Sequence, residues 1–231
     1  MSNLPDTVKR LRILTVGAPG VGKTTANMAC MTGKFPSDAP KEYNDYSDAI
    51  NAQQICVNYH TLGLNVTDLP SVIDDAVADT DNAGKRQVEY GMMHPHHVVI
   101  CMDDISRPDT LVALEQKIIP EFKKSRPAGH PPISFVIVGC KADLRASDDD
   151  NSCVPLEGFE TGKALFLKEE KEGCIGWCEI SAKDAVLKKN PVVGGQRTPQ
   201  GLMVVLEIIV DHWDKMGYFK PEKKKGCCIV Q

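Results

Sequence analysis

The chain has 231 residues, of which 42% are hydrophobic and 25% charged, as in a soluble globular protein with one domain and tails. This composition excludes collagen-like, wholly disordered and disulfide-scaffold proteins. No apolar run approaches the roughly 18 residues that cross a bilayer, and residues 1–12 are too polar for a signal peptide. Nine cysteines, an odd number without regular spacing, favour a reducing, cytosolic environment.

The net charge of −4 is unevenly distributed along the chain. Residues 220–231 contain four lysines and one glutamate, so the remainder is more acidic than the total suggests. An acidic body disfavours nucleic acid as a partner. A basic tail suits the anionic inner leaflet of a membrane.

Short apolar runs alternate with amphipathic stretches from Arg10 onward, which predicts βα units in a mostly parallel sheet. The first strand is expected over residues 11–16 and the first helix over 23–32. Residues 46–65 are expected to form two strands that turn near residues 53–54 and add one antiparallel edge.

Two continuous β-branched runs, at 98–102 and 133–139, need cover on both faces and are predicted to be central strands. Between them, Ser106 is expected to cap a helix that has Pro108 in its first turn and Asp109 completing a capping box.

Two further helices are expected over residues 159–172 and 198–213, the second with apolar side chains at helical spacing. Residues 33–44, 68–95 and 183–201 are expected to be irregular.

Residues 17–24 match G-x-x-x-x-G-K-[ST] directly after a predicted strand and open a helix, which is the context of a phosphate-binding loop. The glycines let backbone N–H groups turn toward phosphate oxygens, Lys23 reaches the β- and γ-phosphates, and Thr24 offers a hydroxyl to Mg²⁺. A coincidental glycine-rich turn is the alternative, and the shared register of strand, glycines, lysine and threonine argues against it. The predicted phosphate-binding residues are Gly17, Ala18, Pro19, Gly20, Val21, Gly22, Lys23, Thr24 and Thr25.

The choice of base is predicted from residues 140–143, Cys-Lys-Ala-Asp, which follow a predicted strand at the edge where open α/β sheets bind ligands. Asp143 can accept two hydrogen bonds there, from N1–H and the exocyclic amine of guanine, a pair of donors that adenine lacks. The Lys141 stem can lie along the base and ribose. The backbone N–H of Ala182, in a later Ser-Ala-Lys run, can meet the guanine O6.

With these motifs the chain resembles the Ras superfamily of small GTPases, most closely its Rho branch. The resemblance is carried by residues 17–24, Phe35-Pro36, residues 44–47, Leu62-Gly63-Leu64, residues 138–145, residues 181–183 and the carboxyl-terminal Cys228-Ile-Val-Gln231. It implies a three-layer α/β fold of the P-loop small G-protein type, with a mostly parallel six-stranded sheet, one antiparallel edge and helices on both faces. It also implies bound GTP or GDP with Mg²⁺, effector and exchange-factor partners, and a monomer.

The same resemblance divides the chain into an extension at residues 1–9, a GTPase domain at 10–215 and a basic hypervariable tail at 216–231. It implies that Tyr43 and Tyr46 contact an effector. The expected guanine-binding residues are Phe35, Cys140, Lys141, Asp143, Ser181, Ala182 and Lys183.

Both switch segments depart from the family pattern. Lys41 stands where the family has a threonine that contacts Mg²⁺ and the γ-phosphate, and an ammonium cannot coordinate a cation. Val66, Leu69 and Pro70 align with the Mg²⁺-side aspartate, the γ-phosphate-sensing glycine and the water-orienting glutamine. Asp68 is a candidate for reaching Mg²⁺ through water.

Two departures lie in the nucleotide motifs themselves. Pro19 replaces a usual glycine, removes one backbone donor and puts a ring where a partner's arginine finger would enter. Cys140 is a weak hydrogen-bonding group where the family usually has Asn or Thr. Groups that bind base and diphosphate are retained while those that serve hydrolysis are altered, so we expect a GTP-binding protein with slow or impaired hydrolysis of GTP to GDP and phosphate.

The carboxyl terminus carries a second specific signal. Residues 228–231 form a C-a-a-X box ending in glutamine, which favours farnesylation of Cys228, and Cys227 is adjacent for palmitoylation. Lysines 223–225 add the second signal that stable anchoring requires. An ordinary frayed lysine-rich terminus is the alternative. The expected location is the cytoplasmic face of the plasma membrane or an endomembrane.

Two other functions stay open. A nucleotide-insensitive scaffold would keep the loop only to stabilise the fold. A P-loop kinase or ATPase would need an adenine-tolerant pocket, against which Asp143 and the lipid box argue. The run His94-Pro-His-His97 invites a zinc interpretation, but no nearby cysteine pair completes four ligands.

Overall fold

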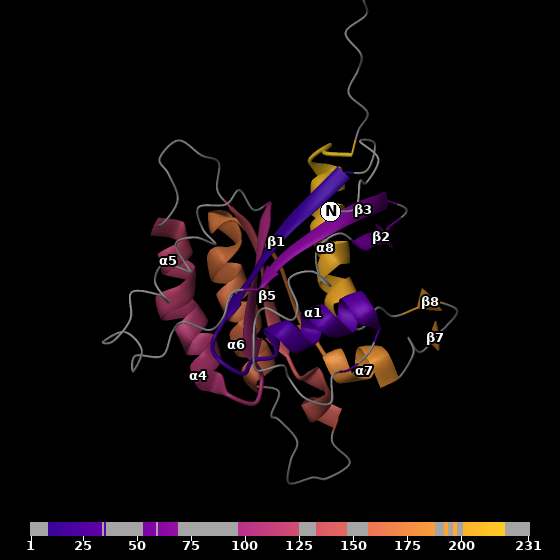
Figure 1. Ribbon diagram of the computed structural model, residues 1–231. Helices are drawn as coiled ribbons and strands as arrows, with labels where there is room; N and C mark the ends of the chain where they lie inside the picture. Colours follow the sequence, from indigo (N-terminus) through magenta and orange to yellow (C-terminus); the bar gives the residue numbers. More distant parts are fainter. Residues whose placement is uncertain are drawn as a thin grey trace, which may run out of the picture.

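The computed structural model describes residues 9–33, 35, 53–58, 60–68, 97–124, 133–146, 157–187, 192–193, 196–197 and 201–219. These residues form a six-stranded sheet between two layers of helices (Figure 1). The strand order is β2-β3-β1-β4-β5-β6, in which the β2–β3 pair is antiparallel and the other neighbouring pairs are parallel. The predicted α/β fold with one antiparallel edge is confirmed.

The strands of this sheet are β1 (Lys9–Gly17), β2 (Gln53–Val57), β3 (His60–Asp68), β4 (Val98–Asp104), β5 (Ser134–Cys140) and β6 (Cys174–Ile180), and a separate hairpin pairs β7 (Val192–Val193) with β8 (Gln196–Arg197). The α-helices are α1 (Lys23–Thr32), α4 (Pro108–Ala113), α5 (Ile119–Lys124), α6 (Glu157–Glu169), α7 (Ala182–Leu187) and α8 (Leu202–Lys215). A π-helical turn, Leu114–Ile118, joins α4 to α5, and 3-10 turns cover Ala142–Ala146 and Glu170–Glu172.

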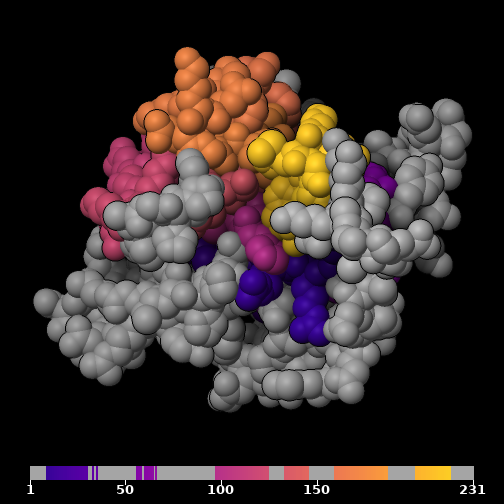
Figure 2. Space-filling model, turned by 90° about the horizontal axis from the view of Figure 1, so that it is seen from above, coloured from indigo at the N-terminus to yellow at the C-terminus, as the bar shows by residue number. Residues whose placement is uncertain are grey.

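The two faces of the sheet bury separate clusters of side chains. Leu11 and Ile13 of β1 pack in the cluster that α1 and α8 cover, while Leu14 and Val16 pack in the cluster under α4, α5 and α6. This alternation is the two-residue period of a strand covered on both faces. Figure 2, a view from above, shows the orange α6–β6 segment between the magenta α4–α5 segment and the yellow α8.

Strands β4 and β5 lie inside the sheet, as the β-branched runs predict, and every residue of β4 is buried. The predicted helix at 159–172 is also present, as α6 followed by a 3-10 turn that ends at Glu172. None of the described helices has the length and apolar character needed to cross a bilayer.

The position of the hairpin turn was predicted wrongly. Residues 53–54 belong to β2, and the chain turns after it, where Asn58 adopts a left-handed conformation with φ of 45°. Asparagine tolerates this conformation, and its amide donates a hydrogen bond to Asp211 on α8 at 2.7 Å. The turn therefore lies at a residue that adopts the left-handed conformation and is also hydrogen-bonded to α8.

Two helix starts also differ from the predictions. Ser106 does not cap α4: its N–H and hydroxyl both bond Asp104, and the residue before the helix is Arg107. The last helix begins at Leu202 instead of residue 198, after Gly201 with φ of 69°.

Part of the segment predicted to be irregular is a helix, α7. The hydroxyl of Ser181 accepts a hydrogen bond from the N–H of Asp184 at 2.9 Å, which is the geometry of a helix cap. A helix of six residues is too short to show hydrophobic periodicity.

Candidate functional site

The loop between β1 and α1 has the glycines that its shape requires. A Cβ on Gly17 would collide with the carbonyl oxygen of Met102 on the neighbouring strand β4. Gly20 and Gly22 have φ values of 71° and 107°, in the left-handed region that glycine adopts without strain. The loop can therefore run close to β4 and turn its backbone N–H groups inward at the start of α1.

Lys23, the first residue of α1, is folded into this loop. Its side chain is buried, and Nζ donates hydrogen bonds of 3.0 Å to the carbonyl oxygens of Gly17 and Ala18. Thr24 and Thr25 follow in the first turn of the helix. A buried ammonium and the positive end of a helix dipole thus both lie at this loop, which favours an anion there.

A cavity of about 230 Å³ opens between this loop and the carboxyl ends of β5 and β6. Its lining residues are Gly20, Val21, Gly22, Thr25, Ala26, Phe35, Cys140, Lys141, Asp143, Ile180, Ala182 and Lys183. The structure therefore brings six of the seven predicted guanine-binding residues together with four residues of the predicted phosphate loop. Ser181 is the seventh; it does not line the cavity but bonds the lining residue Asp143.

Asp143 lies in the 3-10 turn after β5, and its carboxylate is held by Ser181, which follows the neighbouring strand β6. The hydroxyl of Ser181 donates to Asp143 Oδ1 at 2.7 Å and itself accepts from the N–H of Asp184. Lys141 turns the chain out of β5 with φ of 68°, a strained conformation for a residue other than glycine. This turn places Lys141 and Asp143 on the cavity wall together.

Asp104, the last residue of β4, joins the two halves of the site. Its side chain is fully buried, and Oδ2 accepts hydrogen bonds from Lys141 Nζ at 2.6 Å and from Arg107 Nε at 3.0 Å. Oδ1 accepts from the hydroxyl and the N–H of Ser106. Burial alone would raise the pKa of Asp104, but these hydrogen bonds, led by Lys141, hold it below its usual value.

Arg107 extends this network to the phosphate loop. Its Nη2 donates to the carbonyl oxygen of Pro19 at 2.7 Å while its Nε is bound by Asp104. A chain of contacts therefore runs from the loop through Arg107 and Asp104 to Lys141 on the cavity wall.

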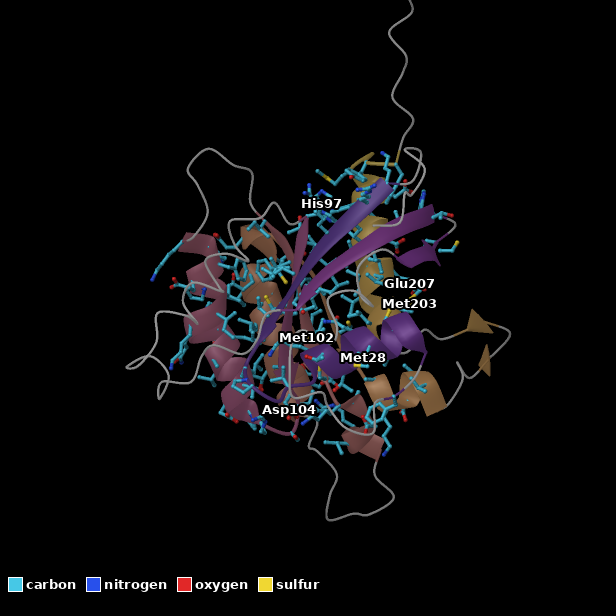
Figure 3. All side chains as sticks on the ribbon, viewed as in Figure 1. Met28, His97, Met102, Asp104, Met203 and Glu207 are labelled. Atoms are coloured by element: carbon cyan, nitrogen blue, oxygen red, sulfur yellow. The ribbon has the colours of Figure 1, made fainter. Side chains whose placement is uncertain are left out.

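His97 lies at the other end of β4, far from this network (Figure 3). Its Nδ1 accepts from the N–H of Arg12 at 3.1 Å, and its ring packs edge-on against Trp213 at 5.3 Å between centroids. Among the residues that the structure describes, no three His, Cys, Asp or Glu side chains lie close enough to hold a metal together. His94 and His96 lie outside those residues.

No family model matches the chain. It is 28% identical over 153 residues to Mitochondrial Rho GTPase 1 of Arabidopsis thaliana, over 66% of this chain and 20% of that protein. It is 26% identical over 161 residues to the Rho-related protein racI of Dictyostelium discoideum, over 67% and 71% of the two chains. It is also 26% identical over 184 residues to the Rho-related GTP-binding protein RhoF of Mus musculus, over 76% and 75%. The chain thus spans only a fifth of the length of the Arabidopsis relative.

The chain is similar to Rho-family GTPases of the Ras superfamily. The three relatives, the sheet order and the cavity agree on this.

The second switch of this Rho-like protein begins with a core residue. Val66, which aligns with the Mg²⁺-side aspartate, is 4% exposed and pairs with Ile13 inside the sheet. Strand β3 continues to Asp68, whose backbone lies beside Thr15 of β1. The structure does not describe the Asp68 side chain, so its Mg²⁺ role stays a prediction.

Cys140 forms part of the cavity floor in this Rho-like protein. The residue is buried, and a Cβ on Gly22 of the loop would lie 3.8 Å from its Cβ. Burial, followed by the charges of Asp103 and Asp104, raises the pKa of the Cys140 thiol far above its usual value. The group is a neutral thiol that packs against the loop.

Other predicted residues lie outside the described part of the chain. They are Lys41, Tyr43, Tyr46, Leu69, Pro70, lysines 223–225, Cys227 and Cys228.

The sequence reasoning missed Asp104 and Arg107. The available signal was a pair of carboxylates, Asp103 and Asp104, at the end of a continuous apolar strand. The carboxyl end of a central parallel strand is where ligands of such sheets bind.

Proposed function

We propose that this Rho-like protein binds GTP and GDP with Mg²⁺, hydrolyses GTP slowly and acts as a membrane-anchored signalling switch or adaptor. The observation that carries the proposal is that residues of the phosphate loop and Asp143 line the same cavity. The similarity to Rho-family relatives, among them a Rho-related GTP-binding protein, supports it.

The residues present fit a guanine nucleotide. The left-handed backbone at Gly20 and Gly22, which both line the cavity, and the buried ammonium of Lys23 suit a diphosphate. The Asp143 carboxylate, held by Ser181, suits the two donors on the guanine edge. We propose that the Lys141 stem covers one side of the base and that Phe35 covers another, since both line the cavity.

Among the described side chains, Thr24 is the one we assign to Mg²⁺. Bound there with phosphate oxygens, the ion would neutralise phosphate charge. Asp68 is the proposed water-mediated partner.

We expect slow hydrolysis because of two residues, Val66 in the second switch and Pro19 in the phosphate loop. Val66 is packed in the core and is aliphatic, so it cannot hold Mg²⁺ or water. Pro19 has no backbone N–H to offer a phosphate oxygen. Because phosphoryl transfer depends on charge neutralisation and a positioned water, we expect a low rate.

Two measurements on the full chain test the proposal. Displacement of fluorescent GDP should succeed with GTP and GDP and fail with an equal concentration of ATP. Single-turnover hydrolysis of bound GTP should be far slower than that of a Rho protein with an intact second switch. Displacement by ATP would refute the guanine site, and a hydrolysis rate equal to that of the intact protein would refute the catalytic part.

The buried Val66 also favours a second function, a scaffold that does not respond to the γ-phosphate. Thermal unfolding with GDP and with a non-hydrolysable GTP analogue separates the two functions. A switch should show different melting temperatures in the two states, whereas a scaffold should show the same value in both.

The tail provides the proposed membrane anchor, through a prenyl group on Cys228, palmitate on Cys227 and lysines 223–225. The last described residues, Tyr218 and Phe219, lie against Lys9 at the start of β1. The tail therefore begins at the end of the sheet opposite the cavity.

A further inference from the structure

We propose that Asp104 is a positioning residue for the nucleotide. Its carboxylate accepts hydrogen bonds from both Lys141 and Arg107 and so connects the base-binding residues 140–143 to the phosphate loop. We infer that this connection slows nucleotide release. This inference rests on the guanine-nucleotide binding proposed above. Asp104, Arg107 and Lys141 together are called the β4 clamp below.

The first contact of the β4 clamp fixes a flexible side chain. Lys141 lines the cavity, and its ammonium bonds Asp104 Oδ2 at 2.6 Å. A lysine side chain loses much rotamer freedom when it is ordered. Because the bond to Asp104 already holds the ammonium, little of that freedom is left to lose when a base arrives.

The second contact of the β4 clamp reaches the loop from outside. The guanidinium of Arg107 is oriented by Asp104 through Nε and bonds the Pro19 carbonyl through Nη2. A Cβ on Gly20 would lie 3.6 Å from the same Nη2, so the guanidinium lies directly against the loop. Movement of the loop away from a bound diphosphate would therefore break this contact.

The negative charge of Asp104 keeps the two cations of the β4 clamp together. Two cations share Asp104 Oδ2, and the carboxylate lies in a fully buried position. Without its negative charge, the ammonium of Lys141 and the guanidinium of Arg107 would repel each other across the buried site. Both side chains are partly exposed, so each can swing into solvent once released.

The test measures dissociation of fluorescent GDP from the full chain after addition of excess unlabelled GDP. Asp104→Asn should raise the rate about 10- to 100-fold, as expected for the loss of charge-assisted hydrogen bonds. The matched control is Asp103→Asn, compared at pH 8, where it removes a buried carboxylate at the same strand end on the opposite face of β4. Its dissociation rate should equal that of the wild type.

A double-mutant cycle separates positioning from a general effect on the fold. Arg107→Gln alone should raise the dissociation rate, and in the Asp104→Asn background it should add little further effect. If Asp104 were only structural, the two effects on the rate would multiply. The side chain of Arg107 is 42% exposed, so this variant tests the β4 clamp even if Asp104→Asn does not fold.

The outcomes distinguish the two proposals. If the wild type binds no fluorescent GDP, the proposed function fails and the inference fails with it. If the wild type binds and both Asp104→Asn and Arg107→Gln release GDP at its rate, the inference alone is wrong. Equal acceleration by Asp103→Asn would also overturn it, because the effect would then come from any charge lost at this strand end.

Discussion

The pKa values of two adjacent carboxyl groups at the end of β4 are shifted in opposite directions. Asp104 is surrounded by donors that keep its pKa low. Burial, with the nearby charges of Glu179 and Asp104, raises the pKa of Asp103 to about 7. Strand alternation explains the difference, because neighbouring residues face opposite sides of the sheet.

The raised pKa of Asp103 predicts a specific pH dependence of stability. The folded state holds this proton more tightly than the unfolded chain, so the free energy of unfolding should fall as the pH rises from about 4 to about 7. Asp103→Asn should remove that fall and be more stable than the wild type at pH 8 by roughly 2–4 kcal/mol.

Chemical denaturation at pH 5, 6, 7 and 8 measures this effect. The exposed Asp214→Asn variant is the control and should keep the slope of the wild type. An Asp103→Asn slope equal to that of the wild type would contradict the assigned protonation.

Asp143 should set the choice of base. Asp143→Asn replaces an acceptor pair with one acceptor and one amide donor, which matches the N1–H and 2-carbonyl of xanthine better than guanine. The affinity for GDP should fall by about 100-fold, and that for xanthosine diphosphate should rise. Competition against fluorescent GDP gives both affinities, and an unchanged preference for GDP would show that Asp143 does not contact the base.

At the scale of elements, the β1–loop–α1 unit depends on the close approach of β1 to β4. Gly17→Ala would place a Cβ against the Met102 carbonyl oxygen, so we expect a loss of about 2 kcal/mol or more in the free energy of unfolding. Gly33→Ala is the control, because its Cβ would meet nothing within 4 Å and only the φ of 65° costs energy, about 1 kcal/mol. Equal destabilisation by the two changes in urea unfolding would contradict this explanation.

The sequence allowed prediction of the elements whose pattern is local. The interior strands are continuous apolar runs, and the residues of the loop before α1 form a contiguous motif, so both could be located without a structure. The hairpin turn, the start of α4 and the helix α7 were missed or misplaced. Each depends on a polar side chain that had more than one available partner: Asn58 bonds Asp211, Ser106 bonds Asp104, and Ser181 bonds both Asp143 and Asp184.

Contacts between residues far apart in the sequence limit prediction of the candidate site. Asp143 and Lys141 belong to one short run, so their pairing with a base could be inferred from spacing. Asp104 and Arg107 act through Lys141 and Pro19, which are 37 and 88 residues away in the chain. Only the packing of β4 between β1 and β5 brings these residues together.

At the scale of the whole molecule, the cavity lies at the carboxyl ends of the strands and the tail begins at their amino ends. The last described residues and the proposed nucleotide site are therefore separated by the length of the sheet. Cys228→Ser should move the protein from the membrane to the soluble fraction of cells without changing GDP affinity.

Cell fractionation and GDP titration of the same variant check both halves of this prediction. Cys227→Ser, which keeps the prenyl site and the lysines, is the control and should retain part of the membrane association. Full membrane association of the Cys228→Ser variant would contradict the anchor.

The most direct test of the nucleotide site is to purify the full chain from cells in the presence of Mg²⁺, denature it, and identify and count the nucleotide released. We predict close to one guanine nucleotide per chain, with GTP in excess over GDP because hydrolysis is slow. A folded protein that releases adenine nucleotide, or none, would contradict the assignment of Asp143 and the phosphate loop to a guanine site.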